Sequence, residues 1–65
     1  MQPYQERVVT ERDDLSGKID RLAQFLDTAA YALLPESERD RMFRQLRHMN
    51  DYREVLDERI AAFAG

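Results

Sequence analysis

Residues 33–36, Leu33-Leu34-Pro35-Glu36, divide this chain of 65 residues into two halves. In each half, apolar residues recur at intervals of three, four or seven, which is the spacing of one face of an amphipathic helix. The first stripe consists of Val8, Leu15, Ile19, Leu22 and Leu26. The second stripe consists of Met42, Leu46, Met49, Leu56, Ile60 and Phe63. Two such helices joined by a short connection predict an all-α fold, the antiparallel helical hairpin.

Two prolines mark where the helices begin. We expect the first helix over about residues 3–27, because Pro3 fits a first helical turn, where its missing N–H would have no partner. We expect the second helix over about residues 35–63. Pro35 disfavours the α conformation at Leu34 and suits the first turn of the helix that follows it.

The connector, about residues 28–34, allows two interpretations. In the first, Thr28 ends the preceding helix and caps a single short turn that carries Tyr31 and Leu34 inward. In the second, the first helix continues to Leu33. Both interpretations leave the chain, residues 1–65, as one helical-hairpin domain.

A connection centred near residue 31 or 32 sets which positions of the two helices face each other. Val8 then meets Leu56, and Leu15 meets Met49, so that apolar residues face apolar residues. Polar residues beside this core are matched as Tyr4 with Arg59, Glu11 with Tyr52, and Lys18 with Gln45. This polar stripe is either a set of hydrogen bonds and ion pairs that fix the register, or a groove walled by tyrosines and arginines.

A hairpin this small needs further stabilisation, because folding buries only about 60% of the surface that such a chain exposes when unfolded. Cysteine is absent, so disulfides are excluded, and the single histidine, His48, cannot build a zinc site. Self-association remains, and we predict an oligomeric helical bundle. The apolar residues left on the flanks of the seam are the expected oligomer interface: Val9, Phe25, Phe43 and Val55.

Composition narrows the function classes. The formal net charge of −3 argues against nucleic-acid binding, and no apolar run approaches the roughly 20 residues that cross a bilayer. The polar N-terminus lacks the features of a signal peptide, which predicts a cytoplasmic protein. No catalytic constellation, metal site or glycine-rich phosphate loop is present in the sequence. We therefore expect a binding protein without enzymatic activity, metal or cofactor.

A basic run occupies the first half of the predicted second helix, where cations oppose the helix dipole. Such placement suggests an external anion or an acidic neighbour, and the candidate acids on the first helix are Asp13, Asp14, Asp20 and Asp27. The run is either a solvated face or a surface for docking a partner protein. The residues assigned to partner binding are Arg41, Arg44, Arg47 and His48.

The order of residues along both helices resembles a known group of sequences. The positions that carry the resemblance are Glu6-Arg7-Val8-Val9, Glu11, Leu15, Lys18-Ile19, Leu22, Phe25-Leu26, Leu34-Pro35-Glu36, Gln45-Leu46, Met49, Tyr52, Val55-Leu56 and Arg59-Ile60. They are similar to a family of short helical-hairpin proteins of phages and prophages, known as hypothetical proteins, with relatives in gut phages of the crAss group.

The architecture also resembles phage hairpin proteins that sequester cyclic nucleotides and thereby silence CBASS immunity. That resemblance implies an oligomer in which a tyrosine stacks on a base and cations meet phosphates. The residues expected to bind such a ligand here are Tyr4, Arg7, Lys18, Tyr52 and Arg59. We therefore expect a phage-encoded protein that sequesters a small anionic ligand, a cyclic nucleotide signal, in the host cytoplasm. The alternative is an adapter or inhibitor that docks a host protein through its basic face.

Overall fold

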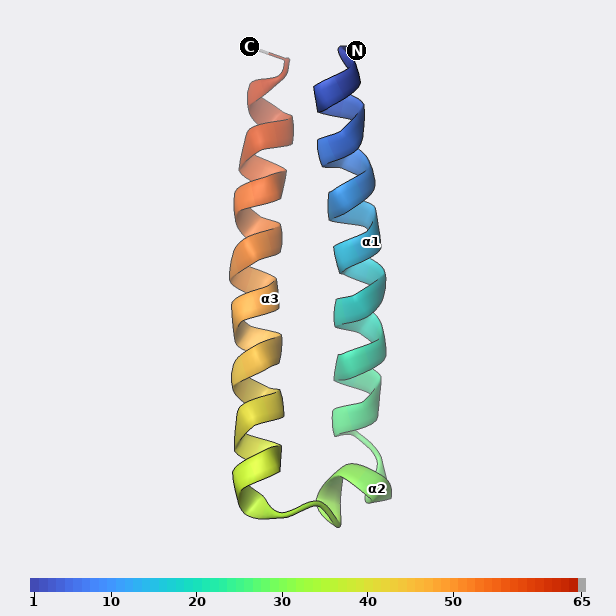
Figure 1. Ribbon diagram of the computed structural model, residues 1–65, viewed down its shortest axis with the longest axis vertical. Helices are drawn as coiled ribbons and strands as arrows, with labels where there is room; N and C mark the ends of the chain where they lie inside the picture. Colours follow the sequence, from blue (N-terminus) through green and yellow to red (C-terminus); the bar gives the residue numbers. More distant parts are fainter. Residues whose placement is uncertain (65) are drawn as a thin grey trace.

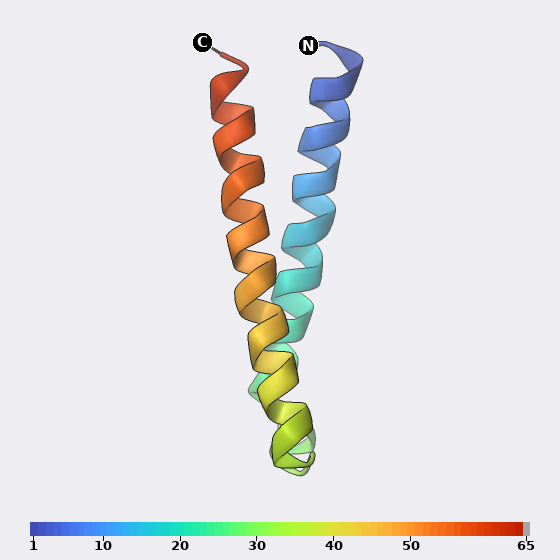
Figure 2. The same ribbon diagram turned by 60° about the vertical axis from the view of Figure 1, so that its left-hand side comes forward.

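The computed structural model describes residues 1–64, and its regular secondary structure is helical throughout. Helix α1 spans Pro3–Leu26, α2 spans Ala29–Ala32, and α3 spans Glu36–Ala62. Helices α1 and α3 run antiparallel, with both termini at one end of the molecule and α2 at the other (Figure 1; Figure 2). The rod measures 46 × 14 × 14 Å. The predicted helical hairpin is confirmed, while its assembly into an oligomer stays a prediction.

Local sequence signals define the start of α1. Pro3 occupies the first turn, as predicted, and the N-cap residue is Gln2. Its backbone N–H donates to Oε1 of Gln5 at 2.8 Å, so the side chain of Gln5 satisfies the N-cap backbone. Glu6 lies in the first turn, where a carboxylate complements the positive end of the helix dipole.

The connector follows the first of its two interpretations, with α1 ending before Thr28. The Thr28 hydroxyl donates to the carbonyl of Phe25 at 2.6 Å and accepts from the N–H of Tyr31 at 3.2 Å, capping α2. The Tyr31 hydroxyl then donates to the carbonyl of Arg39 at 3.0 Å. Nε of Arg39 donates to the carbonyl of Leu34 at 3.1 Å. These bonds fasten α2 and the bend to the first turns of α3.

The core lies on the seam between α1 and α3. Among the described residues, four apolar side chains are buried, namely Val8, Leu15, Ile19 and Leu56. Partly buried residues packed against them are Leu46, Met49, Ile60 and Phe63. All eight belong to the two stripes that the sequence predicts, so helical periodicity identified the core. None of the helices in residues 1–64 is both long and apolar enough to cross a membrane.

The register predicted for the two helices is wrong by about one helical turn. Tyr4 packs edge-to-face on Phe63 with ring centroids 5.9 Å apart, and does not face Arg59. Nη1 of Arg12 lies 3.0 Å from Oδ1 of Asp57, which fixes the same register further along. The reason is that α2 lengthens the connection, so the chain reverses near Pro35 instead of residue 31 or 32. A shift of one turn keeps the same helix faces in contact. The apolar stripes therefore predicted the core residues correctly although the register was wrong.

Two leucines test how much the seam contributes to stability. Leu56 is 1% exposed and Leu33 is 86% exposed, so the substitutions Leu56→Ala and Leu33→Ala remove the same atoms from opposite environments. We expect Leu56→Ala to cost about 2–5 kcal/mol of unfolding free energy, and Leu33→Ala less than about 0.5 kcal/mol. Urea titration followed by circular dichroism measures both. Equal losses would contradict a single core on the α1–α3 seam.

Candidate functional site

A groove of about 400 Å³ lies on one flank of the hairpin, beside the seam. We call it the Tyr52 groove; its lining residues are Arg7, Thr10, Glu11, Asp14, Leu15 and Lys18 from α1 and Tyr52 from α3. Buried Leu15 supplies an apolar floor, and the Tyr52 side chain is 46% exposed. The groove therefore joins an aromatic ring, an apolar base and a row of charges.

The charges of the groove come from one face of α1. Arg7, Glu11, Asp14 and Lys18 follow one another at steps of four, three and four residues, which places them on the same side of a helix. The two cations stand at the ends, about 16 Å apart along the axis at about 1.5 Å per residue. Within residues 1–64, neither cation forms an ion pair with a carboxylate. Both are thus available to an anion from solution.

Three of the five predicted ligand residues line this groove: Arg7, Lys18 and Tyr52. The other two, Tyr4 and Arg59, do not line it. Tyr4 packs on Phe63, and Arg59 lies in the last turn of α3, where it complements the helix dipole. The shifted register explains this separation, because the prediction placed Tyr4 and Arg59 opposite each other.

Sequence reasoning missed that Thr10 and Asp14 belong to the groove. It matched Glu11 with Tyr52 on the polar stripe, for which a groove was one interpretation, and it offered Asp14 as a partner for the basic run of α3. The spacing of Asp14 from Arg7 and Lys18 places it on the same side of α1, and that signal was present in the sequence.

Comparison with known proteins shows which family the chain represents. The Sequestin family model matches residues 2–62. The chain belongs to the Sequestin family. It is also 38% identical, over 63 residues, to the uncharacterized 7.5 kDa protein in the denB–rIIB intergenic region of Enterobacteria phage T4. That match covers 97% of this chain and 98% of the relative.

No solved structure matches the chain significantly. The two sequence matches confirm the predicted membership of a family of small phage proteins. The narrower relation to phages of the crAss group stays a prediction.

Two arginines of the basic run of this Sequestin-family chain are paired with acids within α3. Nε of Arg41 lies 3.1 Å from Oε1 of Glu38, and Nε of Arg44 lies 3.0 Å from Oδ2 of Asp40. Within one copy of the hairpin the acids of α1 do not pair with these two arginines, because acidic residues one turn away on the same helix are closer. Pairing with acids of another subunit stays a prediction. The other two residues assigned to partner binding, Arg47 and His48, are exposed.

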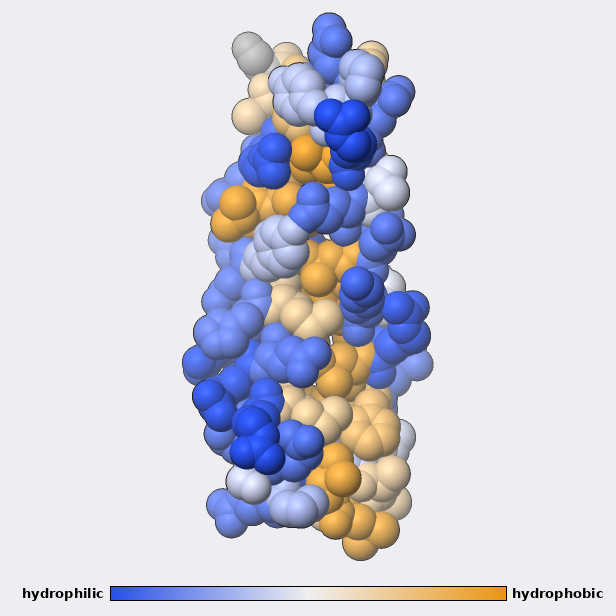
Figure 3. Space-filling view, viewed as in Figure 1, coloured by the Kyte–Doolittle hydropathy of each residue, from blue (hydrophilic) through white to orange (hydrophobic). Residues whose placement is uncertain are grey.

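The residues expected at an oligomer interface lie in different surroundings. Phe43 and Val55 are exposed on α3, whereas Val9 is half-buried. Phe25 packs edge-to-face on Tyr31, with centroids 6.2 Å apart. On the face shown in Figure 3, apolar side chains follow the seam and widen into a patch around α2. Apolar surface suited to self-association is present, and the association itself stays a prediction.

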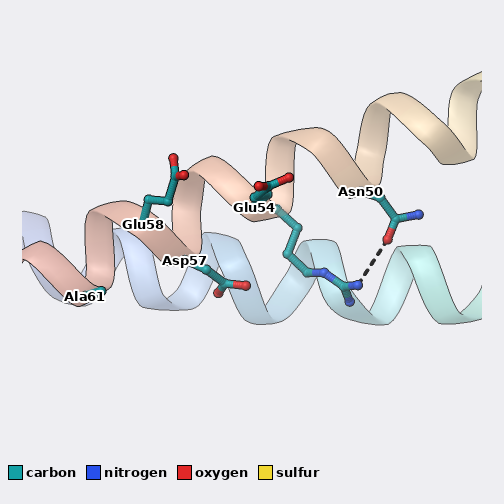
Figure 4. Close-up of a pocket in the computed structure, with 6 residues that line it drawn as sticks. Asn50, Glu54, Asp57, Glu58 and Ala61 are labelled. Carbon is teal, nitrogen blue, oxygen red and sulfur yellow. Dashed lines mark hydrogen bonds between the residues drawn. The ribbon is translucent and has the colours of Figure 1, made fainter.

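The opposite flank carries a second groove of about 430 Å³, lined mainly by polar and acidic residues. Its lining residues are Asn50, Arg53, Glu54, Asp57, Glu58 and Ala61 (Figure 4). Arg53, its one cation, donates from Nη2 to Asn50 at 3.0 Å and from Nη1 to Ser16 at 3.5 Å. This groove is unsuited to an anion, because three carboxylates line it and its arginine is already hydrogen-bonded to Asn50 and Ser16. No cluster of metal-ligating side chains is found in residues 1–64.

A double-mutant cycle tests the observed register and hence the membership of the Tyr52 groove. Because Tyr4 and Phe63 pack edge-to-face, we expect Tyr4→Ala and Phe63→Ala to couple by about 0.5–1.5 kcal/mol of unfolding free energy. The matched cycle of Tyr4→Ala with Arg59→Ala should be additive. Coupling to Arg59 in place of Phe63 would contradict the register, and urea titration measures both cycles.

Proposed function

We propose that this member of the Sequestin family is a non-enzymatic protein that sequesters a small anionic ligand, a cyclic nucleotide immune signal, in the infected cell. The observation that carries the proposal is the Tyr52 groove, which is lined by an exposed aromatic ring and by two cations without carboxylate partners. The family's name, which speaks of sequestration, supports the same role.

Four groups in the groove have a part in this proposal. The ring of Tyr52 stacks on a nucleobase, with the apolar floor at Leu15 beneath it. Arg7 and Lys18 form charge-assisted hydrogen bonds to phosphate oxygens. Sequestration needs no bond to be made or broken, so binding residues suffice and no nucleophile or general base is required.

Self-association completes the proposal. A groove on the side of two helices leaves much of a ligand in water, whereas sites for small molecules bury most of the ligand surface. A second copy of the hairpin supplies the missing cover and also buries exposed apolar side chains such as Phe43 and Val55. Native mass spectrometry of the protein with a mixture of cyclic di- and trinucleotides reports the oligomer and the bound ligand together.

Substitutions in the groove test the assignment of the binding residues. For whichever cyclic nucleotide binds, we expect Arg7→Ala and Lys18→Ala each to weaken affinity about tenfold or more, as a lost charge-assisted hydrogen bond does. Tyr52→Ala should weaken it similarly, and Tyr52→Phe should retain stacking. Isothermal titration calorimetry gives each dissociation constant.

The matched control is Arg44→Ala, which removes a cation that already pairs with Asp40 outside the groove. Its affinity should stay within about twofold of the parent protein. Two results together would overturn the proposal in favour of an adapter role. The first is that the parent protein binds no cyclic nucleotide. The second is that the parent protein captures a host protein and that Arg41→Glu and Arg44→Glu abolish this capture.

A further inference from the structure

A glycine lies in the middle of α1, where glycine is a poor helix former. Gly17 is half-buried although it carries no side chain of its own. The guanidinium of Arg21, one turn further along, covers it, because a Cβ at Gly17 would lie only 3.3 Å from Nη1 of Arg21. The Arg21 side chain therefore folds back along α1 and lies against bare backbone, which only glycine leaves open there.

The helical spacing places both residues on the side of α1 that carries the Tyr52 groove. Gly17 follows the groove residue Thr10 by seven positions. Arg21 follows Asp14 by seven positions and Lys18 by three, and both of these residues line the groove. The folded guanidinium is thus brought to the rim of the groove.

The register sets the aromatic ring of α3 at the same level. Nη1 of Arg53 lies 3.5 Å from the hydroxyl of Ser16, and the ion pair that joins α1 to α3 gives the same register. Because the two helices are antiparallel, one residue back along α3 corresponds to one residue forward along α1. Tyr52 is therefore level with Gly17 and beside Lys18.

The two cations at this level lack a negative partner. Within residues 1–64, neither Lys18 nor Arg21 forms an ion pair with a carboxylate. Like charges three residues apart on a helix destabilise it, so an anion bound between them would relieve their repulsion. A guanidinium offers a planar fork of N–H donors that matches two oxygens of one phosphate, and the lysine ammonium adds a point charge.

From this arrangement we infer that Arg21 is a further phosphate ligand of the Tyr52 groove and that Gly17 keeps its place open. Lys18 and Arg21 hold one phosphate of a nucleotide whose base stacks on Tyr52. Arg7 lies ten residues before Gly17, about 15 Å along the helix axis, so it meets a different part of the ligand. The inference rests on the proposed function and adds two residues to its site.

Substitutions at both positions test the inference, with cyclic GMP–AMP as the probe because it carries two different purine bases. We expect Arg21→Ala to weaken binding about tenfold or more, and Arg21→Lys, which keeps the charge without the planar fork, to recover part of the loss. Gly17→Leu fills the place of the guanidinium and should weaken binding as much as Arg21→Ala. The same change should raise the melting temperature by about 4–8 °C, since leucine is the better helix former. Isothermal titration calorimetry gives the affinities, and circular dichroism shows that the loss is not unfolding.

The matched control is Gln24→Leu, which places the same side chain on an exposed position of α1 beyond the guanidinium and should leave the affinity unchanged. If Lys18→Ala loses binding while Arg21→Ala or Gly17→Leu keeps the affinity of the parent protein, the inference is overturned and the proposed function stands. No binding of cyclic GMP–AMP by the parent protein would also overturn the inference. No binding of any cyclic nucleotide would overturn the proposed function as well.

Discussion

The packing of Leu56 against the apolar stripe of α1 is the contact on which the rest of the molecule depends. Leu56 is the most deeply buried of the four core residues, and the hairpin has no second layer that could replace it. Since only one interface holds the two long helices together, each of its residues carries a large share of a small total stability. Because no second layer covers the seam, both of its flanks lie on the surface, and grooves form there.

The two flanks have different roles. On one flank, Arg12 with Asp57 and Arg53 with Ser16 join the helices by polar contacts. Partly exposed ion pairs of this kind contribute only about 0–1 kcal/mol each, so their effect lies more in fixing the register than in adding stability. On the other flank, the charges at Arg7 and Lys18 remain without carboxylate partners and face solvent. The polar contacts that align the helices are thus separate from the groups available to a ligand.

The connector explains why part of the site was predictable and part was not. The caps at Gln2 and Thr28 act within a few residues, so the ends of α1 and α2 follow from local sequence. The register depends on how many residues the bend consumes, and a helical stripe looks the same after a shift of one turn. Tyr4 was consequently assigned to the groove although it packs on Phe63. The arginines of α3 were assigned distant partners for a similar reason. Sequence spacing does not show whether an arginine pairs with an acid on its own helix or with one on the other helix.

By itself the sequence determined the helical class, the two apolar stripes and the break at Pro35, and it predicted Arg7, Lys18 and Tyr52 as binding groups. These depend on backbone propensity and on a periodicity of about 3.6 residues, which are properties of neighbouring residues. Only the tertiary structure decided that Asp14 shares a groove with Glu11 and Tyr52, and that Tyr4 and Arg59 lie outside it. That outcome depends on where the chain reverses, because the reversal sets which turn of α3 lies beside each turn of α1.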